Sequence, residues 1–161
     1  MQEKIRFGII AAGRISESFA TGLESVGEAR LEAVASRNIQ KAKAFATRFK
    51  AGHAYGSYLE LAQDPDIDVV YIGSPNSLHR EHSLLCLEHG KAVICEKPFA
   101  SNQREAQEMV DLARKKGLFL MEAMWTRYIP MVKKIRGWVA EGRIGRVKLI
   151  KGDFGYKSDN A

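Results

Sequence analysis

Short apolar runs alternate along this chain with segments in which apolar residues recur every three or four positions. The helical spacing is clear at Ala42, Phe45, Ala46 and Phe49, and a run such as 68–72 is apolar almost throughout. Strands of that kind are typical of a parallel sheet covered on both faces. We therefore predict an α/β fold, a Rossmann-type doubly wound parallel sheet with helices on both faces. The six predicted strands are 5–10, 30–35, 54–56, 68–72, 92–95 and 119–121.

The first predicted strand, 5–10, leads through a turn of small residues into a helix over 15–27. Dinucleotide-binding turns at this place carry three glycines, and here the three slots hold Ala11, Gly13 and Ser16. We expect a negative φ at Ala11, close packing of helix and strand at Ser16, and room for a pyrophosphate at Gly13. Taken alone, the motif is a weak signal, and a packing turn that binds no ligand is the alternative.

The tip of the second strand favours one cofactor over another. NAD-binding versions of the fold hold the ribose with an Asp or Glu at this tip, but here it carries Ser36, Arg37 and Asn38. Glu32 lies in mid-strand, and we expect it to be an edge or surface residue. Hydroxyl and guanidinium groups suit a 2′-phosphate, with Lys41 adding charge, which favours NADP with NAD as the alternative. A simply solvated Arg37 remains possible on this stretch alone.

A polar loop follows the strand 68–72, at the edge where open α/β sheets bind ligands. It contains Ser74, Pro75 and Asn76, and His79 opens the next helix. His79 and His82 are three residues apart, but no acid or third histidine stands at a fitting spacing for a metal. We expect surface or cofactor-facing histidines and no metal site.

Lys97 follows the fifth strand, between Glu96 and Pro98. A lysine at such a strand tip lies where the nicotinamide end of a dinucleotide would be, and its ammonium could polarise a hydroxyl or carbonyl and transfer a proton. The alternative is a structural Lys–Glu pair beside a turn proline. The Lys97–Pro98 bond is also a candidate for a cis peptide.

Four motifs occur in one order: the Ala-x-Gly-x-x-Ser turn at 11–16, Ser-Pro-Asn at 74–76 with His79, Glu-Lys-Pro at 96–98, and Met-Glu-Ala-Met-Trp-Thr-Arg-Tyr at 121–128. Together they resemble the glucose–fructose oxidoreductase / inositol dehydrogenase family of NAD(P)-dependent oxidoreductases. The first and last motifs are most similar to its branch of dimeric dihydrodiol dehydrogenases and NADP-dependent xylose dehydrogenases. The resemblance covers essentially the whole chain.

The resemblance implies an NADP-dependent dehydrogenase that moves a hydride between nicotinamide and a CH–OH group of a sugar or cyclic diol. It implies a catalytic role for Lys97, with the pyrophosphate along Ala12–Ile15. The residues expected to bind the cofactor are Ala11, Ala12, Gly13, Arg14, Ile15, Ser36, Arg37, Asn38, Lys41, Ser74, Pro75, Asn76, His79, Glu96, Lys97, Trp125 and Arg127. A non-enzymatic dinucleotide sensor of the same fold is the alternative, although it would not need a proton-transfer group beside the nicotinamide.

Three segments are expected on the same grounds: a dinucleotide-binding domain over 1–125, a connecting helix over 126–143, and the start of a second domain over 144–161. Family members carry a large antiparallel sheet there, so we expect this chain to be the cofactor-binding part of a longer protein, without turnover alone. The apolar stretch 146–154 is predicted to be a strand, and we expect the chain to associate with a second copy through residues 145–156. The expected partners are thus a small-molecule substrate and a homodimer mate.

The composition limits the kinds of ligand and the cellular compartment that we expect. The 161 residues include 25 Lys or Arg and 19 Asp or Glu, which gives a net charge of +6. The basic residues are scattered among acidic ones, and they form no basic run. We expect a solvated surface and an anionic small ligand rather than nucleic acid. The N-terminus does not resemble a signal peptide, no run is long enough for a membrane, and Cys86 and Cys95 have no paired spacing. A reduced, cytoplasmic protein is expected.

Overall fold

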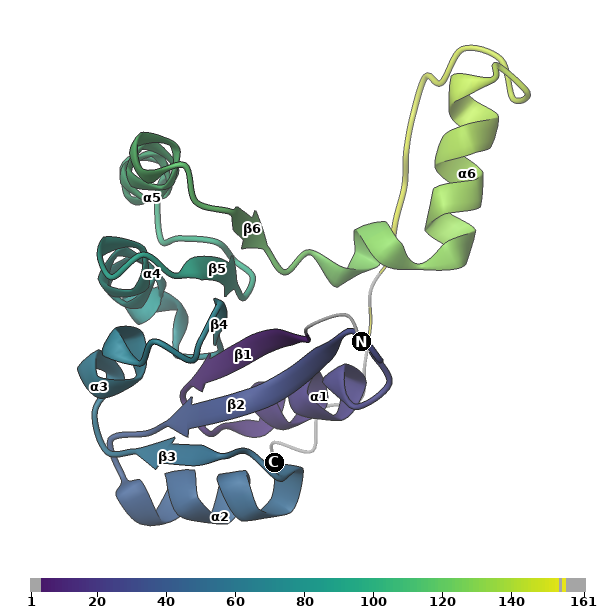
Figure 1. The fold of residues 1–161 in the computed structure, drawn as a ribbon. Helices are drawn as coiled ribbons and strands as arrows, with labels where there is room; N and C mark the ends of the chain where they lie inside the picture. The colour runs from purple at the N-terminus through teal and green to yellow at the C-terminus, as the bar shows by residue number, and fades with distance from the viewer. Residues whose placement is uncertain (1–3, 154, 156–161) are drawn as a thin grey trace. The chain divides into compact units, whose positions relative to one another are not determined.

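The computed structural model describes residues 4–153 and 155. Its first part is one parallel sheet of six strands in the order β3-β2-β1-β4-β5-β6 (Figure 1), the arrangement of a Rossmann fold. The strands are β1 (Ile5–Ile10), β2 (Ala29–Ala35), β3 (His53–Tyr55), β4 (Val69–Ile72), β5 (Ala92–Cys95) and β6 (Leu120–Glu122). All six predicted strands are therefore present, with ends shifted by at most one residue.

Helices cover the sheet on both sides, as the sequence pattern predicts. One buried cluster joins the sheet to α1 and α2 through Ala20 and Phe45. A second cluster joins the other face to α3, α4 and α5 through Leu61, Leu87 and Met109 (Figure 1). The helices are α1 (Arg14–Leu23), α2 (Ile39–Phe49), α3 (Tyr58–Gln63), α4 (His79–Glu88), α5 (Gln103–Lys116) and α6 (Pro130–Ala140), with 3₁₀ turns η1 (Asn76–Leu78) and η2 (Trp125–Tyr128).

Local signals in the sequence set the starts of three helices. The side chains of Asn38, Ser57 and Asn102 accept backbone N–H bonds at the starts of α2, α3 and α5. At Ser57 the bond is reciprocated by Glu60, which completes the predicted capping box. The first helix is shorter than predicted: α1 ends at Leu23, and Val26 is exposed in the turn that follows. Val26 continues the apolar spacing of α1 although it lies beyond the end of the helix. It borders an apolar groove beside β1.

The chain divides into two compact units, Met1–Ala123 and Met124–Ala161. In the second unit α6 has no buried residue, and the apolar stripe of Met131, Ile135 and Val139 is exposed. The predicted strand over 146–154 is wrong for the residues that the structure describes, since 146–153 form no strand. Leu149 and Ile150 are each 84% exposed, and no strand among the described residues pairs with them. Residue 154 lies outside the described residues.

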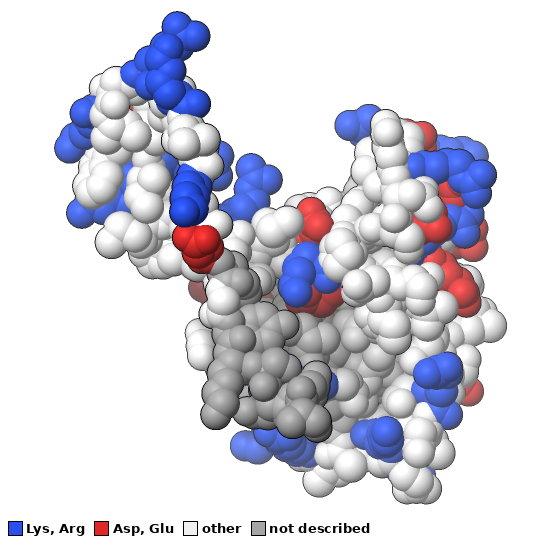
Figure 2. Space-filling view, turned by 180° about the vertical axis from the view of Figure 1, so that it is seen from behind, with Lys and Arg blue, Asp and Glu red and all other residues white. Residues whose placement is uncertain are grey.

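The positive charge is not spread as we expected from the sequence. Residues 1–123 carry 16 Lys or Arg and 16 Asp or Glu, whereas residues 124–161 carry nine and three. The whole net charge of +6 therefore belongs to the second unit, and Figure 2 shows acidic and basic side chains side by side on the visible face of the first. The first unit therefore has no net positive charge that would attract an anionic ligand, and only local groups could bind one there.

Candidate functional site

The carboxyl ends of four neighbouring strands lie at one level of the sheet. Ile10 is in register with Ala35 of β2 and Ile72 of β4, and Ile72 is in register with Cys95 of β5. The ladder continues into the turns, where the N–H groups of Ala11, Gly73 and Glu96 donate to the carbonyl oxygens of Ala35, Ile10 and Ile72. The turns at 36–38, 11–13, 73–76 and 96–98 consequently lie next to one another along one edge.

The turn after β1 is built around a left-handed residue. Ala11 has a φ of +74°, so the expectation of a negative φ was wrong. The conformation is held by Ser16, whose hydroxyl donates to the carbonyl oxygen of Ala11 at 2.6 Å. Ser16 is fully buried, which agrees with the close helix–strand packing expected there. Alanine thus occupies a conformation that usually favours glycine, at a cost of about 1–2 kcal/mol.

Gly13 begins α1 in an extended conformation, with φ −105° and ψ 177°. Any residue adopts these angles, and a Cβ added here would meet no protein atom within 4 Å. The helix also lacks a side-chain cap, so no side chain of the described residues caps its first N–H groups, and the neighbouring Arg14 and Ile15 are exposed. Nothing within the described chain requires glycine at this position, and the space that a Cβ would occupy is open for an anionic ligand.

At the tip of β2, two of the expected residues bond to their own backbone. The Ser36 hydroxyl accepts the N–H of Asn38 at 3.3 Å, and Oδ1 of Asn38 accepts the N–H groups of Gln40 and Lys41 at 2.9 and 3.3 Å. Arg37 is exposed. The Lys41 side chain borders a cavity of about 320 Å³ that also touches Ala12 of the first turn. The cationic groups open to a ligand at this tip are therefore those of Arg37 and Lys41.

Glu32, which we expected at an edge or at the surface, is half-buried. It lies on β2 just before the residues that pair with β3, its side chain is 13% exposed, and it borders a cavity. Its carboxylate pairs with Arg30 at 2.7 Å, so a local ion pair explains this acid.

The histidines after β4 are buried, which corrects the expectation of surface or cofactor-facing rings. The ring nitrogens of His79 lie 2.8 Å from the Pro98 carbonyl oxygen and 2.9 Å from that of Ser74. His82 Nδ1 bonds to the Ser74 hydroxyl at 2.8 Å, and burial lowers the pKa of His82. His79 therefore ties the loop after β4 to the turn after β5, while Pro75 and Asn76 of this loop remain exposed.

Lys97 stands exposed at the end of β5, and the peptide that joins it to Pro98 is cis, as predicted. The structural Lys–Glu pair considered above is absent among the described residues, because the Glu96 carboxylate bonds elsewhere. Its Oε1 accepts the Tyr71 hydroxyl at 2.6 Å and its Oε2 accepts the Lys97 N–H at 3.0 Å. Glu122, at the end of β6, supports the same turn by accepting the Phe99 N–H at 2.9 Å. No motif or spacing pointed to Tyr71, which lies inside an apolar strand.

The remaining expected residues belong to the second unit. Trp125 and Arg127 lie in η2, and both are exposed. Within the described part of the chain, no three His, Cys, Asp or Glu side chains gather as metal ligands would. Among residues 4–153, no helix combines the length and apolar character that crossing a bilayer needs.

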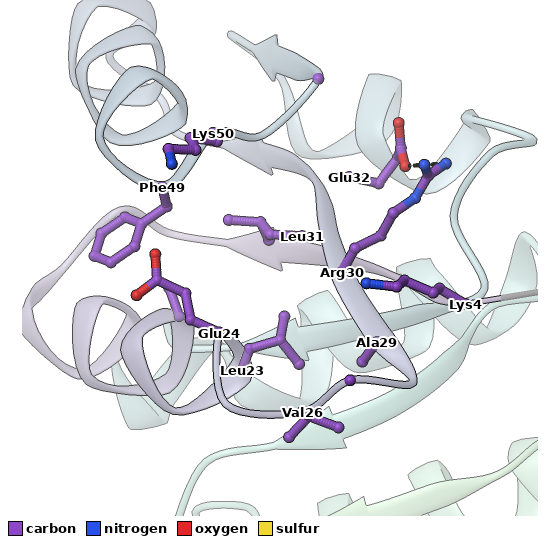
Figure 3. Close-up of a pocket in the computed structure, with 13 residues that line it drawn as sticks. Lys4, Leu23, Glu24, Val26, Ala29, Arg30, Leu31, Glu32, Phe49 and Lys50 are labelled. Atoms are coloured by element: carbon purple, nitrogen blue, oxygen red, sulfur yellow. Dashed lines mark ion pairs between the residues drawn. The ribbon is translucent and has the colours of Figure 1, made fainter.

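A larger cavity, of about 620 Å³, opens at the opposite end of the sheet. It lies between the start of β2 and the ends of α1 and α2, with the Arg30–Glu32 pair and the aliphatic side chains of Leu23 and Val26 along its wall (Figure 3). Open α/β sheets bind their ligands at the carboxyl ends of the strands. We therefore place the candidate site at the edge that carries Gly13 and Lys97.

This edge defines a dinucleotide-binding oxidoreductase domain. Residues 5–124 match the GFO/IDH/MocA family, described as an oxidoreductase family with an NAD-binding Rossmann fold. The chain belongs to this family, which confirms the resemblance inferred from its motifs.

Relatives of known activity agree with the family. The chain is 46% identical over 153 residues to trans-1,2-dihydrobenzene-1,2-diol dehydrogenase of Bos taurus and 43% identical over 153 residues to that of Homo sapiens. Each match covers 94% of this chain and 46% of the relative, so the chain spans about half the length of these proteins. Among solved structures, KijD10, a 3-ketoreductase from Actinomadura kijaniata in complex with NADP, matches with a TM-score of 0.82 and 32% identity, over 89% of this chain and 46% of that one.

Proposed function

We propose that the protein to which this chain belongs is an NADP-dependent dehydrogenase that transfers a hydride between nicotinamide and a CH–OH carbon of a sugar or cyclic diol. The order of the turns along the sheet edge supports this. The turns that carry Arg37, Gly13, Ser74 and Lys97 follow one another from β2 to β5. A dinucleotide held along them would have its adenosine near Arg37, its pyrophosphate at Gly13 and its nicotinamide toward Lys97.

The observation that carries the proposal is the state of Lys97. Its side chain is exposed at the carboxyl edge of the sheet, and the neighbouring Glu96 carboxylate is occupied by Tyr71 and by the Lys97 backbone. When bound, the nicotinamide supplies the hydride chemistry. The Lys97 ammonium would hydrogen-bond to the substrate oxygen and exchange a proton with it.

We infer NADP rather than NAD from the tip of β2. It offers Arg37 and, one turn into α2, Lys41, while the tip 36–38 has no carboxylate to bind a ribose hydroxyl. A guanidinium pairs well with a phosphate, and KijD10 was solved with NADP.

We infer the substrate class from the names of the relatives and the assembly from the family resemblance. The names of the curated relatives point to dihydrodiols, and the resemblance to a dimeric branch points to a homodimer. Cys86 and Cys95 are both buried free thiols, which supports a reduced, cytoplasmic setting.

The experiment is a panel of dihydrodiols and sugars tested with NADP and NAD on the full-length protein, repeated with Lys97→Ala and with the control Lys115→Ala. We expect Lys97→Ala to lower kcat by about 10²- to 10⁴-fold, with the Kd for NADP nearly unchanged and Lys115→Ala fully active. Full activity of Lys97→Ala would overturn the proposal. Tight dinucleotide binding without turnover of any substrate in the panel would favour the sensor.

A further inference from the structure

Tyr71 is a buried polar side chain that the proposed function does not yet use. It lies on β4, one residue before the strand ends, and is 1% exposed. Its hydroxyl donates to Oε1 of Glu96 at 2.6 Å. Burial and the charge of Glu96 raise the pKa of Tyr71 far above its usual value of 10. The group therefore remains a hydrogen-bond donor throughout the working pH range.

The bond to Tyr71 fixes how Glu96 meets the next residue. While Oε1 accepts from Tyr71, Oε2 accepts the backbone N–H of Lys97 at 3.0 Å. A carboxylate held at both oxygens has a defined plane, and this plane orients the Lys97 peptide. The Lys97 side chain, which is attached to that peptide, is exposed.

The Tyr71 ring also lies against α1, the helix that follows Gly13. Phe19 of α1 stacks on it, with ring centroids 3.9 Å apart and planes 9° from parallel. A Cβ on Gly73 would lie 3.1 Å from Cε1 of Tyr71, so the ring is also confined from the end of β4. Tyr71 thus joins the helix of the candidate pyrophosphate turn to the turn that carries Lys97.

We propose that Tyr71 is a positioning residue, which acts through Glu96 to hold the Lys97 peptide, and with it the ammonium, in the orientation needed for proton transfer. This inference rests on the proposed function. The alternative is that the Tyr71 hydroxyl only provides a hydrogen bond for the buried Glu96 carboxylate and so adds stability.

Tyr55 provides a matched control for this alternative. Tyr55 also donates its hydroxyl to a carboxylate, Oδ2 of Asp64, at 3.0 Å. Tyr55 packs against the cluster of α3, α4 and α5, whereas Tyr71 belongs to the cluster of α1 and α2 on the other face. Removing either hydroxyl breaks the same kind of bond, but only Tyr71 is connected to Lys97.

The test compares Tyr71→Phe, Glu96→Gln and Tyr55→Phe in the full-length protein. The first readout, which needs no substrate, is hydrogen exchange of the Lys97 amide followed by NMR. We expect this exchange to be at least tenfold faster in Tyr71→Phe and Glu96→Gln and unchanged in Tyr55→Phe. The second readout is the turnover of the substrate found in the panel, where we expect Tyr71→Phe to lower kcat about tenfold and alter its pH profile, with the Kd for NADP within twofold.

The outcomes separate the two proposals. Unchanged amide exchange and kcat in Tyr71→Phe, with Lys97→Ala inactive, would overturn the positioning role and leave the proposed function intact. An equal loss of kcat in Tyr71→Phe and Tyr55→Phe would show an effect of stability alone and would also overturn it. Full activity of Lys97→Ala would overturn both proposals together.

Discussion

Ser16 and Gly73 meet at the point where α1 crosses the end of β4. A Cβ built on Gly73 would lie 2.3 Å from Oγ of Ser16, closer than real Cβ contacts come. The same hydroxyl donates to Ala11, so it cannot turn aside without releasing the first turn. The close approach of this helix and strand therefore requires a small residue on both sides.

We expect Gly73→Ala to lower the free energy of unfolding by about 1–3 kcal/mol, since the added methyl overpacks a confined site. Urea unfolding of the full-length protein measures this loss. Gly27→Ala is the control, because its Cβ would meet nothing within 4 Å, and its effect should stay within about 0.5 kcal/mol. The double variant Ser16→Gly/Gly73→Ala should recover part of the loss. If the two glycine variants were equally stable, the predicted contact between residues 16 and 73 would be refuted.

Gly13 allows a ligand effect to be separated from a folding effect. Serine is a favourable N-cap residue, and the angles and open space at Gly13 accept it. We expect Gly13→Ser to leave stability unchanged or to raise it by a few tenths of a kcal/mol. It should weaken both NADP and NAD at least tenfold, because the side chain enters the space of the pyrophosphate. Calorimetric titration of both cofactors measures this, and undiminished binding would remove the pyrophosphate from this turn.

Most of the fold was predictable because its signals are local. An apolar run such as Val69–Ile72 is typical of a strand covered on both faces, and a serine three residues before a glutamate, as at Ser57, favours the start of a helix. The order of the strands then follows from the right-handed crossovers of a doubly wound sheet. The candidate edge followed in turn, since parallel strands all end at one side.

The errors arose where distant contacts decide the outcome. The conformation of Ala11 depends on the Ser16 hydroxyl, five residues away. The burial of His79 depends on two backbone carbonyl oxygens, one of them at Pro98. The stretch 146–153 has the composition of a strand but no partner strand. The spacing of apolar residues indicates which face of a segment can be buried. It does not indicate whether another strand or helix is present to bury that face.

We expect Arg37 to bind the 2′-phosphate that distinguishes NADP from NAD. A charge-assisted contact contributes about 1.5–3 kcal/mol, so we expect Arg37→Ala to weaken NADP by about ten- to a hundredfold and to leave NAD nearly unchanged. The Kd values can be measured through nicotinamide fluorescence of the reduced cofactors. Arg104→Ala, whose side chain is 86% exposed on α5, is the control for a lost surface charge. Equal weakening of both cofactors would mean that Arg37 stacks on adenine and does not bind the phosphate.

His82 should make the protein less stable in mild acid. Burial lowers its pKa below the usual 6.5, and the charges of His79 and Arg37 act in the same direction, against the opposing effect of Glu81. The unfolded chain therefore binds this proton at a higher pH than the folded chain, and the free energy of unfolding falls as the pH drops below about 6.5. One such group contributes a slope of at most about 1.4 kcal/mol per pH unit.

We expect His82→Gln to flatten this fall, because glutamine can still bond to the Ser74 hydroxyl but does not titrate. Urea unfolding from pH 8 to pH 5 follows the effect in both proteins. At pH 8 the difference between them reports the lost contact with the ring of Tyr58, 4.6 Å between centroids. That difference should shrink steadily toward pH 5, since only the wild type must keep an uncharged imidazole buried. Parallel curves over the whole range would show that the loop at Ser74 is stabilised by packing alone and that His82 does not couple it to pH.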